Sequence, residues 1–286
     1  MRASRTRRCR GLGIGVLVAG LLFAIGCGSS DSGGSTTAKS GGARATQNLT
    51  VCFDGASPPQ EYYASAHKPA GSEVEILQAI ADTAHYKLTY HQLQFNGLIP
   101  ALLSKQCDIV AAGMFVKPDR LKVIDFAIYS VNGQTIMVQK GNKVGITGYD
   151  GSLAGKTIGM TAGYATIPVV QKKCAEVGAG AKKPCKVVQF GNPTDTYQAL
   201  KTGKVDSVID ATTSVAYFTS QNSSTFEIVK TPVLLPSDVG FGVRKGAGAL
   251  LTSLRTGIDR LYGNGAMCKI LTKWNIGATA RPPHSC

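Results

Sequence analysis

One arginine and two acids have the types and positions that suit capture of a small doubly charged molecule. Asp54 and Asp210 each stand directly after a short apolar segment, and Arg120 lies a few residues beyond another. Arginine binds a carboxylate through two parallel hydrogen bonds, and an acid suits an ammonium group. Together they predict a site for a molecule that carries both groups.

The predicted elements bring further residues to the same place. Residues 113–115 follow one apolar segment, and Tyr164 follows another at the start of an expected helix. In open α/β sheets, ligands bind beyond the carboxyl ends of the strands. The free N–H groups at the start of a helix also favour an anion. We therefore expect these residues to meet at one binding edge.

Strand-like and helix-like segments alternate along most of the chain. Short apolar runs predict strands at residues 49–53, 108–112, 134–139, 157–161, 186–190, 206–209 and 239–243. Apolar residues with the helical period predict helices at residues 73–85, 98–105, 166–177, 194–202, 247–262 and 266–274. This alternation is typical of doubly wound, parallel α/β sheets.

The net charge of +14 does not indicate a nucleic-acid partner. Five arginines lie within residues 1–26, which hold no acid, so the rest of the chain carries 26 basic and 17 acidic residues. These residues are scattered, without the basic patch and interleaved aromatic residues of nucleic-acid binders. The hydrophobic content of 43% allows a sizeable core, which excludes a largely disordered chain.

Sequence signatures of common enzymes are missing from the chain. It contains no GxSxG, no HExxH and no phosphate-binding loop, and spacing dictates no pair of carboxylates. The four histidines are scattered and no CxxC occurs, so we expect no metal and no cofactor.

Residues 1–26 have the organisation of an export signal. Five arginines precede the uncharged residues 11–25, which are short for a membrane-spanning helix of about 20 residues. The segment then ends in Ala-Ile-Gly-Cys at residues 24–27, which resembles the lipobox of bacterial lipoproteins. The resemblance implies cleavage before Cys27 and lipidation of that cysteine. An ordinary signal peptide with an incidental cysteine is the alternative.

The next segment is expected to be a flexible tether. Thirteen of the twenty residues at 28–47 are Gly, Ser or Thr, and such a segment buries too little to offset its ordering entropy. As a flexible coil it spans roughly 25 Å. Residues 27–47 would therefore link the lipid to a folded body outside the membrane.

Six cysteines lie beyond Cys27, an even number that favours structural disulfides in an exported protein. The sequence does not fix their connectivity, because six cysteines can pair in many ways. Proximity favours Cys174 with Cys185 and Cys268 with Cys286, and Cys52 with Cys107 is then left by elimination.

A collinear series of motifs carries a more specific resemblance. Residues 95–102 read FNGLIPAL, residues 112–120 read AGMFVKPDR, and Asp125-Phe126 follow. GSEVE at 71–75, GKVD at 203–206 and ILTKW at 270–274 extend the series across roughly residues 48–276. The chain resembles the solute-binding proteins of polar amino-acid ABC importers, in which these stretches read close to GLIPAL, AGMT-x-TPER and DFS-x-PY.

The resemblance implies a type II periplasmic-binding-protein fold, in which two doubly wound α/β lobes are joined by two crossover strands. Residues 48–138 with 236–286 would form the first lobe and 139–235 the second. A ligand that contacts both lobes stabilises the closed state, which the membrane permease of an ABC importer recognises. The implied protein is a monomer, lipid-anchored on the extracytoplasmic (periplasmic or outer) face of the cell membrane.

The resemblance also assigns site residues. Arg120 stands where the family's arginine clamps the ligand carboxylate, and Gly113, beside Ala112, where a backbone group contacts the ligand. Phe95 matches an aromatic residue of the pocket and Asp54 an acid at its edge. A core role for Phe95 and a structural turn at Asp54 are the alternatives.

Other positions depart from the family pattern. Phe115 replaces a serine or threonine that donates to the carboxylate, and Tyr164 replaces a small hydroxyl residue. The family's ammonium-binding aspartate falls on Ala211, with Asp210 one residue early. Asp210 either turns into that role or caps a helix that begins at Thr212.

The implied function is capture of an amino acid and delivery to the permease, without a cofactor. Glutamate, aspartate, glutamine and amino-acid derivatives are the candidate ligands, and the basic body mildly favours an anion. An exported dehydratase-like enzyme on the same fold is one alternative, which would need a positioned acid or base with a shifted pKa. A ligand sensor for a membrane kinase is another.

Overall fold

The computed structural model describes residues 46–65, 67–179 and 183–286. The described residues form one compact unit. The expected export signal, the expected lipid on Cys27 and all but the last two residues of the expected tether lie outside the described residues. Within the described part, no helix combines the length and the apolar character needed to cross a membrane.

The unit is built on a mixed sheet of nine strands, in which the long strand β7 (Ile124–Gln139) is central. On one side of β7 lie, in order, β12 (Leu234–Arg244), β6 (Ile109–Val110), β1 (Gln47–Phe53) and β5 (Tyr86–Gln92). On the other side lie β10 (Ser207–Ala211), β8 (Thr157–Thr161) and β9 (Lys186–Phe190), and β11 (Phe226–Ile228) pairs with the end of β7.

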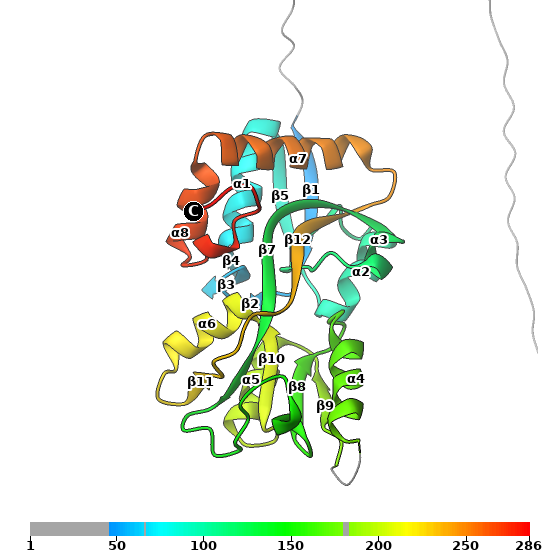
Figure 1. Cartoon of the computed structure of the whole chain (residues 1–286). Coiled ribbons are helices and arrows are strands. Elements are labelled where there is room, and N and C mark those ends of the chain that lie inside the picture. The colour runs from blue at the N-terminus through cyan, green and yellow to red at the C-terminus, as the bar shows by residue number, and fades with distance from the viewer. Residues whose placement is uncertain (1–45, 66, 180–182) are drawn as a thin grey trace, which may run out of the picture. The chain divides into compact units, whose positions relative to one another are not determined.

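Strands β7 and β12 run between the two halves of this sheet (Figure 1). β7 pairs antiparallel with β12 from Ile124 to Gln134, and with β10 from Gln134 to Met137. The outer strands are parallel: β5 and β6 flank β1, and β9 and β10 flank β8. The predicted α/β architecture with two crossover strands is confirmed.

Helices cover both halves with their apolar faces. The first half, around β1 and β12, is covered by α1 (Ser72–Ala84), α2 (Leu98–Leu103), α3 (Pro118–Leu121), α7 (Gly248–Gly263) and α8 (Ala266–Lys273). The second half, around β8, is covered by α4 (Ile167–Val177), α5 (Pro193–Lys201) and α6 (Thr212–Gln221). Ile80 of α1 packs in one core with Ile258 of α7, and Val170 of α4 packs in another with Ile209.

Several elements differ from the sequence expectations. A second, three-stranded sheet of β2 (Ala56–Ser57), β3 (Glu61–Ser65) and β4 (Lys68–Ala70) was not expected, because its polar, Pro-containing sequence has no strand-like alternation. The strand expected at 108–112 is reduced to Ile109–Val110. The strand expected at 134–139 begins at Ile124, because β7 continues through both halves of the sheet.

The three expected disulfides are confirmed. Cys52–Cys107, Cys174–Cys185 and Cys268–Cys286 have Cα–Cα distances of 5.7, 4.6 and 5.2 Å. The first joins β1 to the segment that leads into β6, the second joins α4 to the segment before β9, and the third fixes the C-terminus to α8.

Candidate functional site

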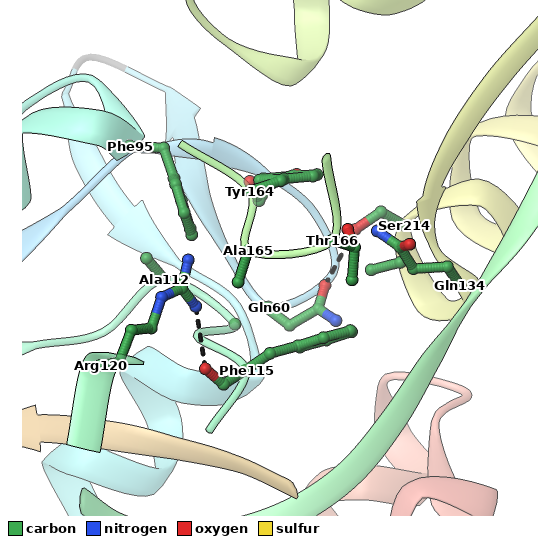
Figure 2. A pocket seen from close by; sticks show the side chains of 13 residues that line it. Gln60, Phe95, Ala112, Phe115, Arg120, Gln134, Tyr164, Ala165, Thr166 and Ser214 are labelled. Carbon is green, nitrogen blue, oxygen red and sulfur yellow. Dashed lines mark hydrogen bonds between the residues drawn. The ribbon is translucent and has the colours of Figure 1, made fainter. Parts of the chain in front are cut away.

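A cavity of about 440 Å³, including its mouth, lies between the two halves of the sheet. Its lining comes from both halves and from β7: Ser57, Gln60, Phe95, Ala112, Gly113, Phe115, Arg120, Gln134, Tyr164, Ala165, Thr166, Ala211 and Ser214. Of the eight residues predicted to bind ligand, six are among them, and Asp54 and Asp210 are not. Figure 2 shows Arg120 at one end of the cavity and Gln134 at the other.

Arg120 is held in place by carbonyl groups from both sides of the cavity. It lies on the single turn of α3 and is 8% exposed. Its Nη1 donates to the Phe115 carbonyl at 2.9 Å, its Nη2 donates to the Gly163 carbonyl at 3.0 Å, and its guanidinium lies 5.4 Å from the centre of the Phe95 ring. Burial lowers the pKa of Arg120 to about 10, so the group stays charged at neutral pH. Asp119 pairs instead with Lys122 at 2.6 Å.

Position 163 requires glycine, because the backbone there lies close to the opposite wall of the cavity. Gly163 has a φ of +86°, and a Cβ atom there would lie 2.9 Å from the Cα of Asn96 in the first half. Beside it, the Phe95 and Tyr164 rings meet edge to face with centroids 5.0 Å apart. The two walls of the cavity are therefore in direct contact at this end.

Gln60 forms a second link between the walls, at the start of α6. Its Nε2 donates to the Thr213 hydroxyl, and its Oε1 accepts from the Ser214 hydroxyl at 3.4 Å. Asn132 of β7 also donates to the Thr213 hydroxyl, at 2.9 Å. The start of α6 is thus tied both to the first half and to the crossover strand.

Gly113 has the left-handed φ of +54° and its N–H group already has a partner. The N–H donates to Oε2 of the buried Glu73 at 3.1 Å, and the Tyr129 hydroxyl donates to Oε1 of the same carboxyl group at 2.6 Å. Burial raises the pKa of Glu73 to about 7, and these two hydrogen bonds limit the rise. An acid behind the cavity therefore positions Gly113.

Two more buried acids, Asp54 and Glu61, lie next to Glu73. Asp54 accepts from the Ala56 N–H at 2.9 Å and from the Ser57 hydroxyl at 2.9 Å, so it stabilises a turn. Both carboxyl oxygens of Glu61 lack a donor among the described residues. Burial, and then the charges of Asp54 and Glu73, raise the pKa of Glu61 well above its usual range.

Neither predicted aspartate lines the cavity. Asp54 is in the turn just described, and Asp210 accepts from the Tyr197 hydroxyl at 2.8 Å and from the Ala211 N–H at 2.6 Å. Burial raises the pKa of Asp210 to about 6. The alternative that Asp210 caps the helix from Thr212 is wrong, because Ala211 is the N-cap residue and no side chain caps α6. The structure does not bring the predicted acids to the predicted arginine.

The sequence expectations missed several polar lining residues, of which Gln134 and Thr166 are the most informative. Each is 2% exposed, and Gln134 Oε1 and Thr166 Oγ1 have no hydrogen-bond partner among the described residues. Gln134 begins a predicted strand and Thr166 a predicted helix. Their position at element ends was a usable signal.

Known proteins of similar sequence and structure support the family resemblance seen in the sequence. The family model of bacterial extracellular solute-binding proteins, family 3, matches residues 49–277. ABC transporter arginine-binding protein 1 of Escherichia coli K12 is 25% identical over 82% of this chain and 93% of its own length. The structure of an ancestral arginine-binding protein bound to arginine is 30% identical, with a TM-score of 0.73 over 81% of this chain and 99% of that one.

A likeness in fold alone links the chain to an ancestral amino-acid-binding protein that is a precursor of cyclohexadienyl dehydratase. It is 23% identical, with a TM-score of 0.71 over 79% of this chain and 95% of that one. These neighbours have the two-lobed type II fold that the sequence predicted. From the match over residues 49–277, the chain belongs to the bacterial extracellular solute-binding proteins, family 3.

Proposed function

We propose that this protein is the solute-capturing component of an ABC importer, and that its cavity binds an amino acid or a related small carboxylate. The observation that carries the proposal is the buried, charged Arg120, fixed by two carbonyl groups in the cavity lining. Two of its N–H groups are used in this way, which leaves the others for a ligand. A carboxylate is the anion that a guanidinium binds with the best geometry.

Among the candidate ligands, the lining favours a carboxylate with an uncharged polar group over an acidic amino acid. Arg120 is the one charged side chain among the described residues that line the cavity. The second carboxylate of glutamate or aspartate would find no second cation there. An uncharged amide group on the ligand would meet the amide of Gln134 at the opposite end.

Closure around the ligand would provide the signal to the permease. The proposed lobes are residues 48–138 with 236–286 and residues 139–235, joined through β7 and β12. Arg120, Gln60 and Gly163 contact across the cavity, and a bound solute would add contacts to both walls. The ligand then stabilises the closed state by its preference for that state.

The remaining parts of the proposal concern the N-terminus and the partners. The export signal would be removed, Cys27 would carry lipid, including palmitate, and the body would work as a monomer on the outer face of the membrane. The names of the relatives as binding proteins support a role in binding and not in catalysis. Mass spectrometry of the protein from membranes would detect the lipid on Cys27.

Thermal-shift screening tests the proposal directly. The purified protein would be screened against the twenty amino acids, amino-acid derivatives, hydroxy acids and simple sugars. A ligand at a hundred times its Kd stabilises the folded state by about 2.7 kcal/mol. We expect one or a few carboxylates to raise the Tm and the Arg120→Gln variant not to respond. A response to sugars alone would reject the proposal.

A further inference from the structure

The charged groups of the cavity restrict the other groups that a carboxylate ligand can carry. The lining contains one charged side chain, the cationic Arg120, and no aspartate or glutamate among its described residues. An ammonium group loses its hydration on burial and needs a paired acid to offset that loss. A zwitterion would therefore bring a second positive charge into a cavity that already holds one.

Three of the buried acids near the cavity have hydrogen-bond donors as partners, and the fourth, Glu61, lies beside Asp54 and Glu73 and does not line the cavity. Asp210 precedes the lining residue Ala211, but its carboxyl group is bonded to the Tyr197 hydroxyl and to the Ala211 N–H. Asp54 is bonded within its own turn, and Glu73 is bonded to Tyr129 and to the N–H of Gly113. None of these three acids lines the cavity.

The end of the cavity opposite Arg120 offers neutral oxygen atoms instead. Gln134 Oε1 and Thr166 Oγ1 are buried without a partner among the described residues. A carbonyl oxygen only accepts hydrogen bonds, and a buried acceptor without a donor is unfavourable. Gln134 therefore calls for an N–H or O–H donor on the ligand, which an uncharged group supplies without the desolvation of a cation.

Resting on the proposed function, we propose that the preferred ligand carries one negative charge and no positive charge. Its carboxylate binds Arg120, and an uncharged N–H or O–H group binds Gln134 Oε1 and Thr166 Oγ1. The ligand class is that of 2-hydroxy acids, lactams such as pyroglutamate, and N-acylated amino acids. Cationic amino acids, arginine among them, are excluded.

Matched ligand pairs test this inference on the wild-type protein. Titration calorimetry would compare alanine with lactate, leucine with 2-hydroxyisocaproate and phenylalanine with phenyllactate, and glutamine with pyroglutamate. Within a pair that shares its side chain, the hydroxy acid should bind at least about tenfold more tightly. The ammonium group of the amino acid would lose its hydration on burial and find no carboxylate to pair with. Arginine should show no binding.

A charge introduced at Ala211 should reverse the preference. Ala211 lines the cavity, pairs with Gln134 across β10 and β7, and is an N-cap residue, where aspartate and asparagine are both favourable. Ala211→Asp should bind the amino acid of a pair more tightly than the hydroxy acid. Ala211→Asn, with the same shape and no charge, should keep the wild-type order.

The outcomes separate this inference from the proposed function. Tighter binding of the amino acids by wild-type protein, lost in Arg120→Gln, would overturn the inference and leave the carboxylate site standing. Equal response of Ala211→Asp and Ala211→Asn would also overturn it. If no carboxylate of either kind binds, the proposed function itself fails.

Discussion

The guanidinium of Arg120 and the carbonyl of Gly163 form a 3.0 Å hydrogen bond that joins the two walls of the cavity. The same guanidinium is bonded to the carbonyl of Phe115, so its orientation is set from its own wall as well. A charged group that is fixed before the ligand arrives loses little conformational entropy on binding. Arg120 is therefore a contact between the walls as well as the proposed anion site.

Substitution of Gly163 should impair closure. In Gly163→Ala, the added Cβ would lie 2.9 Å from the Cα of Asn96, a backbone atom that cannot move alone. We expect the ligand affinity to fall by about tenfold or more, since overpacking of this kind typically costs about 1–3 kcal/mol. Calorimetric titration with the ligand from the screen measures the change.

Gly246→Ala is the matched control for this prediction. Gly246 has a φ of +82°, close to that of Gly163, but a Cβ there would have no atom within 4 Å. Both variants should lose stability from the left-handed backbone, and Gly163→Ala alone should lose affinity. Equal affinities of the two variants would show that the approach to Asn96 is unimportant for binding.

The buried acid Glu73 should make stability depend on pH. Its pKa rises from 4.5 to about 7 on folding, so the native state holds a proton that the unfolded state releases. The contribution of this proton to the stability of the native state is complete below about pH 4.5 and is lost as the pH rises to about 7. Glu73 should thereby lower the free energy of unfolding by on the order of 3 kcal/mol across this window.

Urea unfolding at several pH values checks this effect. Glu73→Gln should reduce the slope between pH 4.5 and 7, because glutamine keeps an acceptor oxygen but does not titrate, and the buried Asp210 and Glu61 should account for the slope that remains. Glu75→Gln is the control: Glu75 lies on the same helix and pairs with Lys273 at 2.6 Å on the surface. It should leave the slope unchanged. A slope that is unchanged in Glu73→Gln would contradict the role of Glu73.

The three disulfides should contribute unequally. Cys52–Cys107 closes a separation of 55 residues and Cys174–Cys185 one of 11. On loop-closure entropy, replacing the first pair by alanine should cost about 4 kcal/mol and the second about 3 kcal/mol. Denaturant unfolding of the two double variants measures both costs. A larger loss from the second pair would contradict the entropic account.

Much of the fold was predictable from the sequence because it depends on local patterns. The helical period fixed α1 and α7 to within a residue or two of the expected bounds, and the apolar runs located β1, β8 and β9. Proximity along the chain was enough to pair Cys174 with Cys185. Arg120 and Gly113 reached the cavity as expected from their place after β6.

The remainder depends on contacts between distant residues. Asp210 was a plausible ligand residue by sequence position, but its orientation is set by the Tyr197 hydroxyl on α5. Gln134 shares the cavity because β7 passes from one half of the sheet to the other, and the apolar run at 134–139 did not predict that crossing. Glu61 lies in a small sheet whose sequence reads as a turn. Burial of these polar residues followed from tertiary packing.

The carboxylate clamp is tested most directly by a titration that changes the ligand and the protein together. The tightest-binding carboxylate from the screen and its primary amide would each be titrated into wild-type protein and into Arg120→Gln. The wild type should bind the amide about a hundredfold more weakly, since hydrogen bonds to charged groups are worth about 1.5–3 kcal/mol each. The variant should bind the two alike. A wild type that binds both equally, or a variant that keeps the preference, would contradict the role of Arg120.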